Sequence, residues 1–381
     1  RPAMTIDLVF PAFPPALDGI GDHTARLARS LADRASVRVL TAQPDPEAVS
    51  DVQVERSFSL PPRRGIRELS EALRTRTPDW LFVQFNQFSY GRWGLNPFLP
   101  ATLARIRRTH PDVRIAVLFH EDFVPVTSWT NAVMTTWQRA QFWSLGRIAD
   151  RVFFTIDAWV REYSPWFPDT PVGHLPVGSN IPCVDGRSPD VRKRLGLGDD
   201  SFVLGVFGSL HESRLLSHIH AAAAALAERD EDVRLLYVGP HGSAFDDEMN
   251  DLPVLDAGCL NAQDVSRCFQ AMDVYLAPFV DGVSTRRGSY MTGLQHGVPT
   301  VSTEGPLTDP LLRDVDGEAH MLAPTGHPQA FAEEVLRLWA APNLRARLGQ
   351  TGRRLYEDRF TFDAIADRLL DTVSNHAPAR V

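Results

Sequence analysis

The chain has 381 residues, 44% of them hydrophobic and 23% charged, which is the composition of a soluble globular protein. This length accommodates two or three domains. The net charge of −8 gives no sign of a nucleic-acid partner, and no apolar run approaches the roughly 18 residues of a membrane-spanning helix. Three cysteines without metal-ligand spacing are typical of reduced thiols. We therefore expect a cytoplasmic protein with no nucleic-acid partner and no stable membrane insertion.

Apolar runs and amphipathic segments alternate along the first half of the chain. Strands are expected at residues 5–10, 37–41, 80–84, 114–119 and 152–155, and helices at residues 23–32, 66–74 and 99–108. This alternation predicts a mostly parallel, doubly wound α/β sheet.

A stretch rich in Pro, Gly and Ser at residues 175–189 interrupts the pattern and is interpreted as an interdomain linker. A second α/β series follows it. Strands are expected at residues 202–207, 233–238, 274–277 and 300–302, and helices at residues 215–227, 264–272, 288–296, 328–340, 343–356 and 362–374. Two Rossmann-like halves joined by a linker predict a central cleft between two domains.

Three turns that follow strands are candidate anion-binding sites. The loop 281–287 ends in Arg286 and Arg287 and precedes a helix that begins at Gly288. A helix N-terminus at the carboxyl end of a parallel strand suits a phosphate, and so do guanidinium groups; ordinary surface arginines are the alternative. The turn 208–214 also ends in a cation, and the loop 11–21 carries glycines. Together the three turns suggest a phosphate-bearing ligand.

Histidine and aromatic residues mark the first half. His120 follows the strand 114–119, where its imidazole can donate to a substrate hydroxyl or phosphate, or serve a structural role. The aromatic loop 85–98 is a candidate for stacking on an acceptor, and aromatic core is an equally good account. The segment 126–147 reads as core packing, the wall of an acceptor pocket, or a membrane-surface helix. The acceptor-binding candidates are Phe88, Tyr90, Trp93 and Trp129.

The order of several motifs resembles the retaining GT-B glycosyltransferases of family 4, the group 1 type. DGIGDHTARLARSLA resembles the family's Gly-Gly loop and first helix, VLFHED its strand ending in His-Asp, and ADRVFFTIDAW its Ala-Asp-Arg-Val strand. LPVGSN loosely resembles its entry to the second domain. AMDVYLAP, HGVPTVST and the end NLRARLGQTGRRLYEDRFTF are also similar to the family. The resemblance implies an acceptor domain at residues 4–178 and a donor domain at 179–360, with the helix 361–376 packing back on the first.

The chain departs from the family's pattern at the donor site. Ser209 and Arg214 stand where the family has arginine and lysine. Ser284 and Thr292 stand where it has two glutamates eight residues apart, for the donor sugar and the ribose. Asp281 is expected to replace the first carboxylate, Thr292 to bond a ribose hydroxyl, and Arg286 or Arg287 to replace the missing cation.

The resemblance implies transfer of a hexosyl-type group from a nucleoside diphosphate sugar such as a UDP-sugar to a hydroxyl, with retained configuration (EC 2.4). It implies no metal and no further cofactor. The acceptor is a sugar, a lipid-linked molecule or a small metabolite, in polysaccharide or glycoconjugate biosynthesis. The implied catalytic residues are His120, Arg214 and Arg286, and the implied donor-binding residues are Gly19, Gly21, Gly208, Ser209, Cys259, Leu260, Asp281, Ser284, Arg287, Gly288, Ser289 and Thr292.

Two other functions remain open from the sequence. A nucleotide-sugar epimerase would need acids and bases to move protons, and the candidates are His120, Glu121 and His211. A non-catalytic relative that binds a nucleotide sugar or assists a partner transferase is favoured by the absence of the two glutamates.

Overall fold

The computed structural model describes residues 4–60, 65–184, 189–198, 200–209 and 213–374. The chain forms two compact units. The first comprises the residues up to Pro176 together with those from Phe362 onward, and the second comprises Val177–Thr361. Among the described residues, no helix is both long and apolar enough to cross a membrane.

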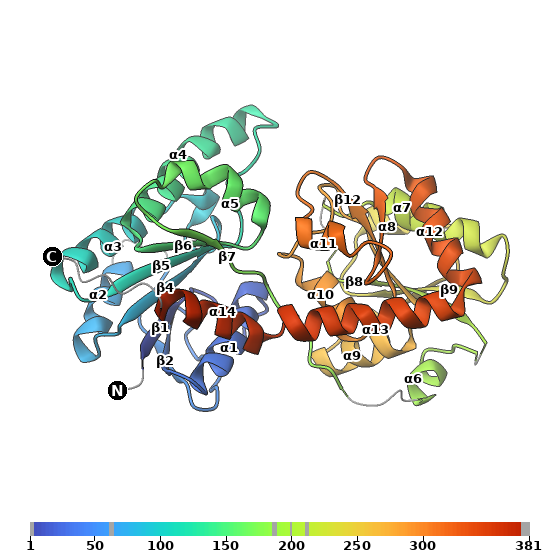
Figure 1. Ribbon diagram of the computed structural model, residues 1–381, viewed down its shortest axis with the longest axis horizontal. Helices are drawn as coiled ribbons and strands as arrows, with labels where there is room; N and C mark the ends of the chain where they lie inside the picture. Colours follow the sequence, from blue (N-terminus) through green and yellow to red (C-terminus); the bar gives the residue numbers. More distant parts are fainter. Residues whose placement is uncertain (1–3, 61–64, 185–188, 199, 210–212, 375–381) are drawn as a thin grey trace. The chain divides into compact units, whose positions relative to one another are not determined.

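The first unit is built on a seven-stranded parallel sheet with the order β3-β2-β1-β4-β5-β6-β7 (Figure 1). The strands are β1 (Thr5–Val9), β2 (Ser36–Thr41), β3 (Gln53–Arg56), β4 (Trp80–Phe85), β5 (Arg114–Phe119), β6 (Arg151–Phe154) and β7 (Val172–His174). The helices are α1 (Gly19–Ala32), α2 (Gly65–Thr75), α3 (Phe98–Thr109), α4 (Trp129–Ile148) and α5 (Asp157–Tyr163), with short 3-10 segments η1 (Arg92–Gly94) and η2 (Ser164–Trp166).

The second unit contains a six-stranded parallel sheet with the order β10-β9-β8-β11-β12-β13. The strands are β8 (Phe202–Phe207), β9 (Val233–Val238), β10 (Val254–Asp256), β11 (Val274–Ala277), β12 (Thr300–Glu304) and β13 (Met321–Pro324). The helices are α6 (Pro189–Arg194), α7 (Leu216–Ala227), α8 (Ser243–Glu248), α9 (Ala262–Ala271), α10 (Gly288–Gln295), α11 (Pro310–Asp314), α12 (Pro328–Ala340) and α13 (Pro342–Arg359).

The last helix, α14 (Phe362–Ser374), belongs to the first unit and lies beside α1 (Figure 1). Phe362, Ile365 and Leu369 enter the same apolar core as Leu27 and Leu31 of α1. Burial of large apolar side chains stabilises such a pairing by roughly 1.5–3 kcal/mol for each fully buried residue.

The central strands match the expected positions closely, whereas short edge elements were missed. β4 is buried at all six positions, as parallel strands covered on both faces are. The edge strands β3, β7 and β10 have no fully buried residue, so their sequences lack an apolar run. β13 and the short helices α5, α6, α8 and α11 were also not expected. Helix α1 begins at Gly19 rather than at residue 23, because the Asp18 carboxylate caps its first turn.

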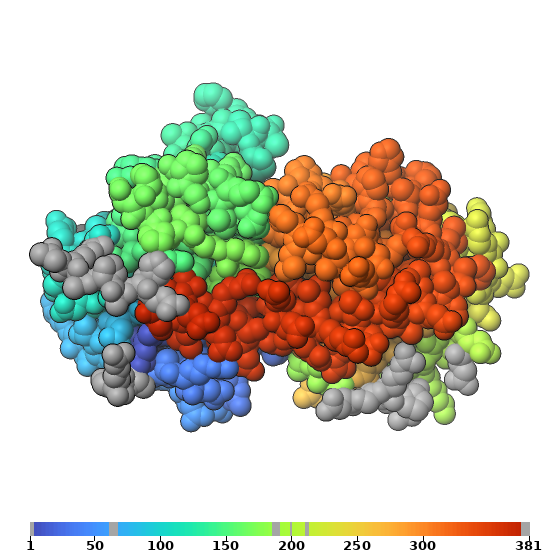
Figure 2. Space-filling model, in the orientation of Figure 1, coloured from blue at the N-terminus to red at the C-terminus, as the bar shows by residue number. Residues whose placement is uncertain are grey.

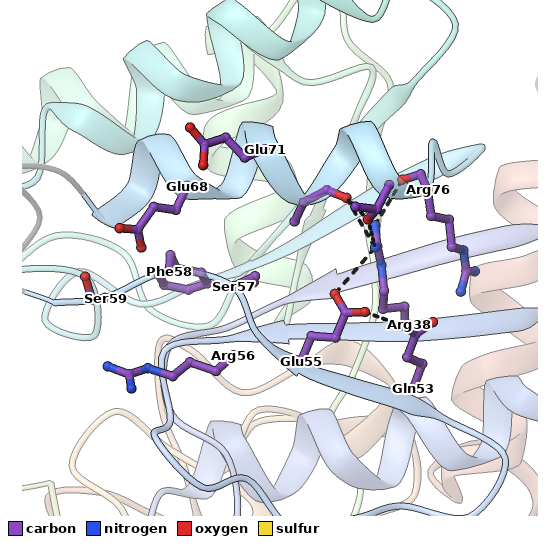
Figure 3. A pocket seen from close by; sticks show the side chains of 12 residues that line it. Arg38, Gln53, Glu55, Arg56, Ser57, Phe58, Ser59, Glu68, Glu71 and Arg76 are labelled. Atoms are coloured by element: carbon purple, nitrogen blue, oxygen red, sulfur yellow. Dashed lines mark hydrogen bonds and ion pairs between the residues drawn. The ribbon is translucent and has the colours of Figure 1, made fainter.

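A hollow of about 740 Å³ lies in the first unit between β3 and α2 (Figure 3). Beside it the buried Arg38 guanidinium pairs with Asp7 at 2.5 Å and also donates to the backbone oxygens of Ala72 and Arg76. These bonds tie the C-terminal end of α2 to β1 and β2. None of the residues singled out in the sequence lines this hollow, so we assign Arg38 a structural role.

Candidate functional site

The carboxyl ends of β8 and β11 meet in the second unit, where the sequence predicts an anion site. Arg214 forms an antiparallel bridge with Phe279. The Leu215 N–H donates to the Pro278 oxygen at 3.3 Å, and the Val280 N–H donates to the Ser213 oxygen at 3.0 Å. These bonds bring the cation that follows β8 to the loop that follows β11.

Two arginines converge on the ring of Phe279. The guanidinium carbons of Arg214 and Arg287 lie 4.8 and 4.6 Å from the ring centroid. The Arg214 Nη2 donates to the Phe207 oxygen at 2.8 Å, and the Arg287 Nη1 to the Ser213 hydroxyl at 3.3 Å. Aromatic faces attract guanidinium groups, so Phe279 holds both cations at the ends of these strands.

Arg214 is a buried cation with an unsatisfied donor. It is 8% exposed, its Nη1 has no hydrogen-bond partner among the described residues, and no described carboxylate pairs with it. A buried charge without a counter-charge is costly. This arrangement is therefore suited to an anionic ligand that completes the pairing.

Small and hydroxyl-bearing residues surround Arg214. Gly208 has a φ of +104°, and a Cβ built there would lie 3.6 Å from the Arg214 Nη2 and 3.8 Å from the Ser289 Cβ. Burial raises the pKa of the Tyr275 hydroxyl, and the neighbouring Arg214 cation and Ser289 hydroxyl partly offset this. Ser289 stands in the first turn of α10, which no side chain caps. The N–H groups at the N-terminus of α10 and the Arg214 guanidinium are thus placed to bind the same anionic ligand.

The loop between β11 and α10 is held rigidly. The Asp309 carboxylate, 1% exposed, accepts the Thr285 N–H at 2.6 Å and the Thr285 hydroxyl at 2.9 Å. The Thr303 hydroxyl accepts the Phe279 N–H at 2.7 Å. Gly282 has a φ of +83°, and a Cβ there would lie 2.2 Å from the Thr308 hydroxyl. These contacts fix the backbone conformation of the loop that carries Ser284, Arg286 and Arg287.

Replacing Asp309 should loosen this loop. Asp309→Ala removes the acceptor of two buried donors, and we expect it to lower the free energy of unfolding by about 1–3 kcal/mol. Asp309→Asn keeps one acceptor oxygen and should cost less. Asp314→Ala, on the exposed surface of α11, is the control and should stay within about 0.5 kcal/mol of wild type. Urea unfolding measures all three, and equal stabilities of Asp309→Ala and the control would contradict the role of Asp309.

In the first unit, His120 belongs to a buried hydrogen-bond relay. The Thr24 hydroxyl donates to the Ile20 oxygen and accepts from the Gln84 amide nitrogen at 2.5 Å. This orients the Gln84 amide oxygen toward the His23 Nδ1, at 3.0 Å, and the His120 Nε2, at 2.9 Å. Because an amide oxygen only accepts, the His120 Nε2 carries the hydrogen.

The relay determines what His120 can do. Burial and the neighbouring His23 hold the pKa of His120 well below its usual range, and burial lowers the pKa of His23 to about 4. In the neutral ring the Nε2–H is bonded to Gln84, so only Nδ1 is left to contact a ligand, and Nδ1 is an acceptor. The expectation that His120 donates to a hydroxyl or phosphate is therefore corrected. His120 can instead accept a hydrogen bond from a ligand hydroxyl.

The N-terminus of α1 already holds a carboxylate. Asp18 accepts the Ile20 N–H at 2.9 Å and the Gly21 N–H at 2.8 Å. Gly21 was expected among the donor-binding residues, but its N–H is already occupied and a negative charge sits beside it. Gly21 instead allows a close approach, because a Cβ there would lie 3.1 Å from the Ala12 oxygen. Gly19 is exposed.

Two further expected contacts are contradicted by burial. Thr292 is 1% exposed, donates to the Gly288 oxygen at 3.0 Å and lies 2.9 Å from the Ser179 hydroxyl, so it does not present a group to a ribose. Tyr90 is also 1% exposed, and its hydroxyl donates to the Gln84 oxygen at 2.8 Å, so its ring has no free face for an acceptor. Both residues support the loops around the sites.

The remaining expected residues are distributed as follows. Ser209, Cys259 and Leu260 are exposed beyond β8 and β10, and Asp281, Arg286 and Gly288 are partly buried. Ser284 is buried, with a hydroxyl that has no partner among the described residues. Phe88, Trp93 and Trp129 are exposed. His211 lies outside the described residues, within which no group of three or more His, Cys, Asp or Glu side chains is placed to hold a metal ion.

Reasoning from the sequence missed the residues that support the site, namely Thr24, His23, Gln84, Tyr275, Phe279 and Asp309. A signal for Gln84 was present, because it is the one polar residue in the apolar run WLFVQF of β4. Asp309, directly before Pro310 at the start of α11, matches a helix N-terminal signature.

The fold of the chain is similar to that of proteins of known structure. Sucrose-phosphate synthase from Thermosynechococcus elongatus superposes with a TM-score of 0.74 over 98% of both chains, at 18% identity. HepE from Anabaena, in a structure with UDP and glucose, gives a TM-score of 0.69 over 98% of this chain and 100% of that chain, at 16% identity. The fold is GT-B. At these identities the likeness establishes the fold alone.

A family model matches part of the second unit of this GT-B chain, and a curated relative matches about half of the chain. Residues 201–341 match the family described as glycosyl transferases group 1. The putative glycosyltransferase EpsD of Bacillus subtilis (strain 168) is 25% identical over 187 residues. That match covers 46% of this chain and 47% of EpsD, so it spans about half of that relative. The group 1 match includes Arg214, Phe279, Arg287 and the whole of α10.

Proposed function

We propose that this protein is a glycosyltransferase that moves a sugar from a nucleoside diphosphate sugar to an acceptor hydroxyl, with retention and without a metal ion. The observation that carries the proposal is the buried Arg214, whose Nη1 lacks a partner among the described residues, beside Arg287 and the uncapped N-terminus of α10. The group 1 glycosyltransferase match over residues 201–341 supports it.

The proposed catalysis rests on stabilising the negative charge that develops on the leaving group. As the anomeric C–O bond breaks, negative charge grows on the departing diphosphate, and donors aimed at that charge lower the barrier. Arg214, Arg287 and the first N–H groups of α10 supply such donors. Retention is inferred from the family resemblance, in which the leaving phosphate takes the acceptor proton. His120, as an acceptor at Nδ1, would hold a hydroxyl of a substrate bound to the first unit.

UDP is the first nucleotide to test, because the HepE structure, which shares this fold, holds UDP. Thermal unfolding should be followed with UDP, GDP, ADP and dTDP, each with and without EDTA. A ligand at a hundredfold excess over its Kd stabilises the native state by about 2.7 kcal/mol. We expect the melting temperature to rise with one nucleotide and EDTA to leave the rise unchanged. No rise with any nucleotide would contradict the proposal, and loss of the rise in EDTA would contradict metal independence.

A non-catalytic nucleotide-sugar-binding protein is the second candidate. It is favoured by Ser284 and Thr292, which stand at the family's carboxylate positions, and by the burial of Thr292. Release of UDP from UDP-sugars by the purified chain distinguishes the two candidates. Nucleotide binding without any donor hydrolysis or transfer would establish the second.

A further inference from the structure

Exposed apolar side chains gather on one part of the first unit. Of the large hydrophobic side chains exposed among the described residues, most belong to the loop that contains η1, to α4 or to the segment before α4: Phe88, Trp93, Leu95, Val126, Trp129, Val133 and Trp143. Trp129 is 83% exposed and Trp93 60% exposed. Core packing, one of the roles expected for the segment 126–147, holds for Phe142 but not for Trp129 and Trp143.

These residues form a continuous face on α4. The exposed positions Trp129, Val133, Thr136, Ala140, Trp143 and Arg147 recur every three or four residues, which places them along one side of the helix. The Trp137 indole donates to the Trp93 oxygen at 3.1 Å, and the Gln141 amide donates to the Gly94 oxygen at 2.6 Å, so η1 lies against the same helix. We call this surface, made by η1 and the exposed side of α4, the α4 face.

The two segments that carry the α4 face are basic in sequence. Residues 85–111 and 123–149 contain no Asp, Glu or Lys, although 47 residues of the chain are acidic and its net charge is −8. They contain six arginines: Arg92, Arg105, Arg107, Arg108, Arg139 and Arg147. Arg107 and Arg147 lie 4.0 and 3.8 Å from Asp150 and Asp169. Arg92 and Arg139 are exposed and form no ion pair with a described residue.

The arginines stand beside aromatic rings. The Arg92 guanidinium lies 4.9 Å from the ring centroid of Trp93, and that of Arg147 lies 5.6 Å from the ring of Trp143. Indoles with an apolar body and a polar N–H, next to basic groups, are typical of the membrane–water interface. An amphipathic helix with this composition lies in the plane of the interface rather than across it.

The N-terminal part of α4 also projects from the rest of the first unit (Figure 2). A projecting helix end that carries Trp129 can reach a flat surface without steric obstruction from its own unit.

We propose that the α4 face docks on an anionic lipid surface, with its indoles at headgroup depth and its arginines against lipid phosphates. A second copy of the chain fits the face less well, because pairing two α4 faces would bring arginines together. The docking does not depend on the proposed glycosyl transfer, and it uses residues of the first unit alone.

Co-sedimentation of the full chain with lipid vesicles tests the proposal. One set of vesicles is phosphatidylcholine alone, and the other is phosphatidylglycerol and phosphatidylcholine in equal parts. We expect at least about tenfold stronger binding to the anionic vesicles, weakened by added salt because exposed charges are screened. The double variant Trp129→Ser, Trp143→Ser should reduce this binding at least about tenfold. The control Leu17→Ser, which changes an exposed apolar residue that is not part of the face, should not.

A charge reversal provides the second variant. Arg92→Glu with Arg139→Glu should abolish the preference for anionic vesicles, whereas Arg354→Glu with Arg359→Glu on α13, the same change of charge elsewhere, should preserve it. Circular dichroism checks that each variant is folded. Equal binding to both kinds of vesicle, or no binding, would overturn the proposal. Sedimentation velocity showing a dimer that the Trp129→Ser, Trp143→Ser variant dissociates, without vesicle binding, would assign the face to a second copy instead.

Discussion

Arg214→Ala should reduce glycosyl transfer by about 10²–10³-fold, the loss seen when a donor aimed at developing negative charge is removed. Its affinity for the nucleoside diphosphate should fall as well, because the buried guanidinium then no longer meets the phosphate. Stability without ligand should change little, since the substitution removes a buried cation whose Nη1 lacks a partner among the described residues. Steady-state kinetics, calorimetric titration with UDP and urea unfolding measure the three effects.

Two variants sharpen the Arg214 test. Arg214→Lys keeps the charge but loses the bond geometry and the contact with Phe279, so it should retain part of the affinity. Arg337→Ala on α12, which removes an exposed arginine from the same unit, should bind UDP as wild type does. Unchanged nucleotide affinity in Arg214→Ala would remove the arginine from the site and with it the main support for the proposed function.

Gln84→Leu should lower turnover by about 10–100-fold, by analogy with the range found when a partner that orients a metal-ligating histidine is removed. Leucine cannot accept from the His120 Nε2, so the proton is free to occupy Nδ1, and the acceptor that we assign to a substrate hydroxyl is lost. The buried N–H groups of His23 and His120 also lose their partner, which should cost about 1–3 kcal/mol of stability. The 15N shifts of the His120 ring report the tautomer directly.

Gln84→Glu separates a positioning role from a merely structural one. The carboxylate still accepts from His120, so turnover at alkaline pH should recover well above that of Gln84→Leu. The new negative charge raises the pKa of His120, and once Nδ1 is protonated it cannot accept a hydroxyl. Activity of Gln84→Glu should therefore fall as the pH falls through this raised pKa, at pH values where wild type is still active. Identical pH profiles for Gln84→Glu and wild type would exclude the proposed role of His120.

Strands in the middle of each sheet were predictable because each is marked by an apolar run of neighbouring residues. β5, β8, β9 and β11 begin and end at the residues expected, since each is an apolar run buried on both faces. The edge strands β3, β7 and β10 were not, because an edge strand buries little and is defined by the neighbour that it pairs with. The early start of α1 has a local cause, the Asp18 cap, which the sequence pattern contained.

The sequence by itself determined the α/β class, the linker and the positions of Arg214, Arg287 and His120 after their strands, because periodicity and turn motifs are carried by neighbouring residues. Only the tertiary structure decided what each group can contact. The proton on His120 depends on Gln84 and Thr24, which lie far away along the chain, and Thr292 is occupied by Ser179. Core packing was one of the roles expected for the segment 126–147, yet Trp129 and Trp143 of α4 are exposed. Burial and hydrogen-bond partners are set by residues distant in sequence, so local pattern does not contain them.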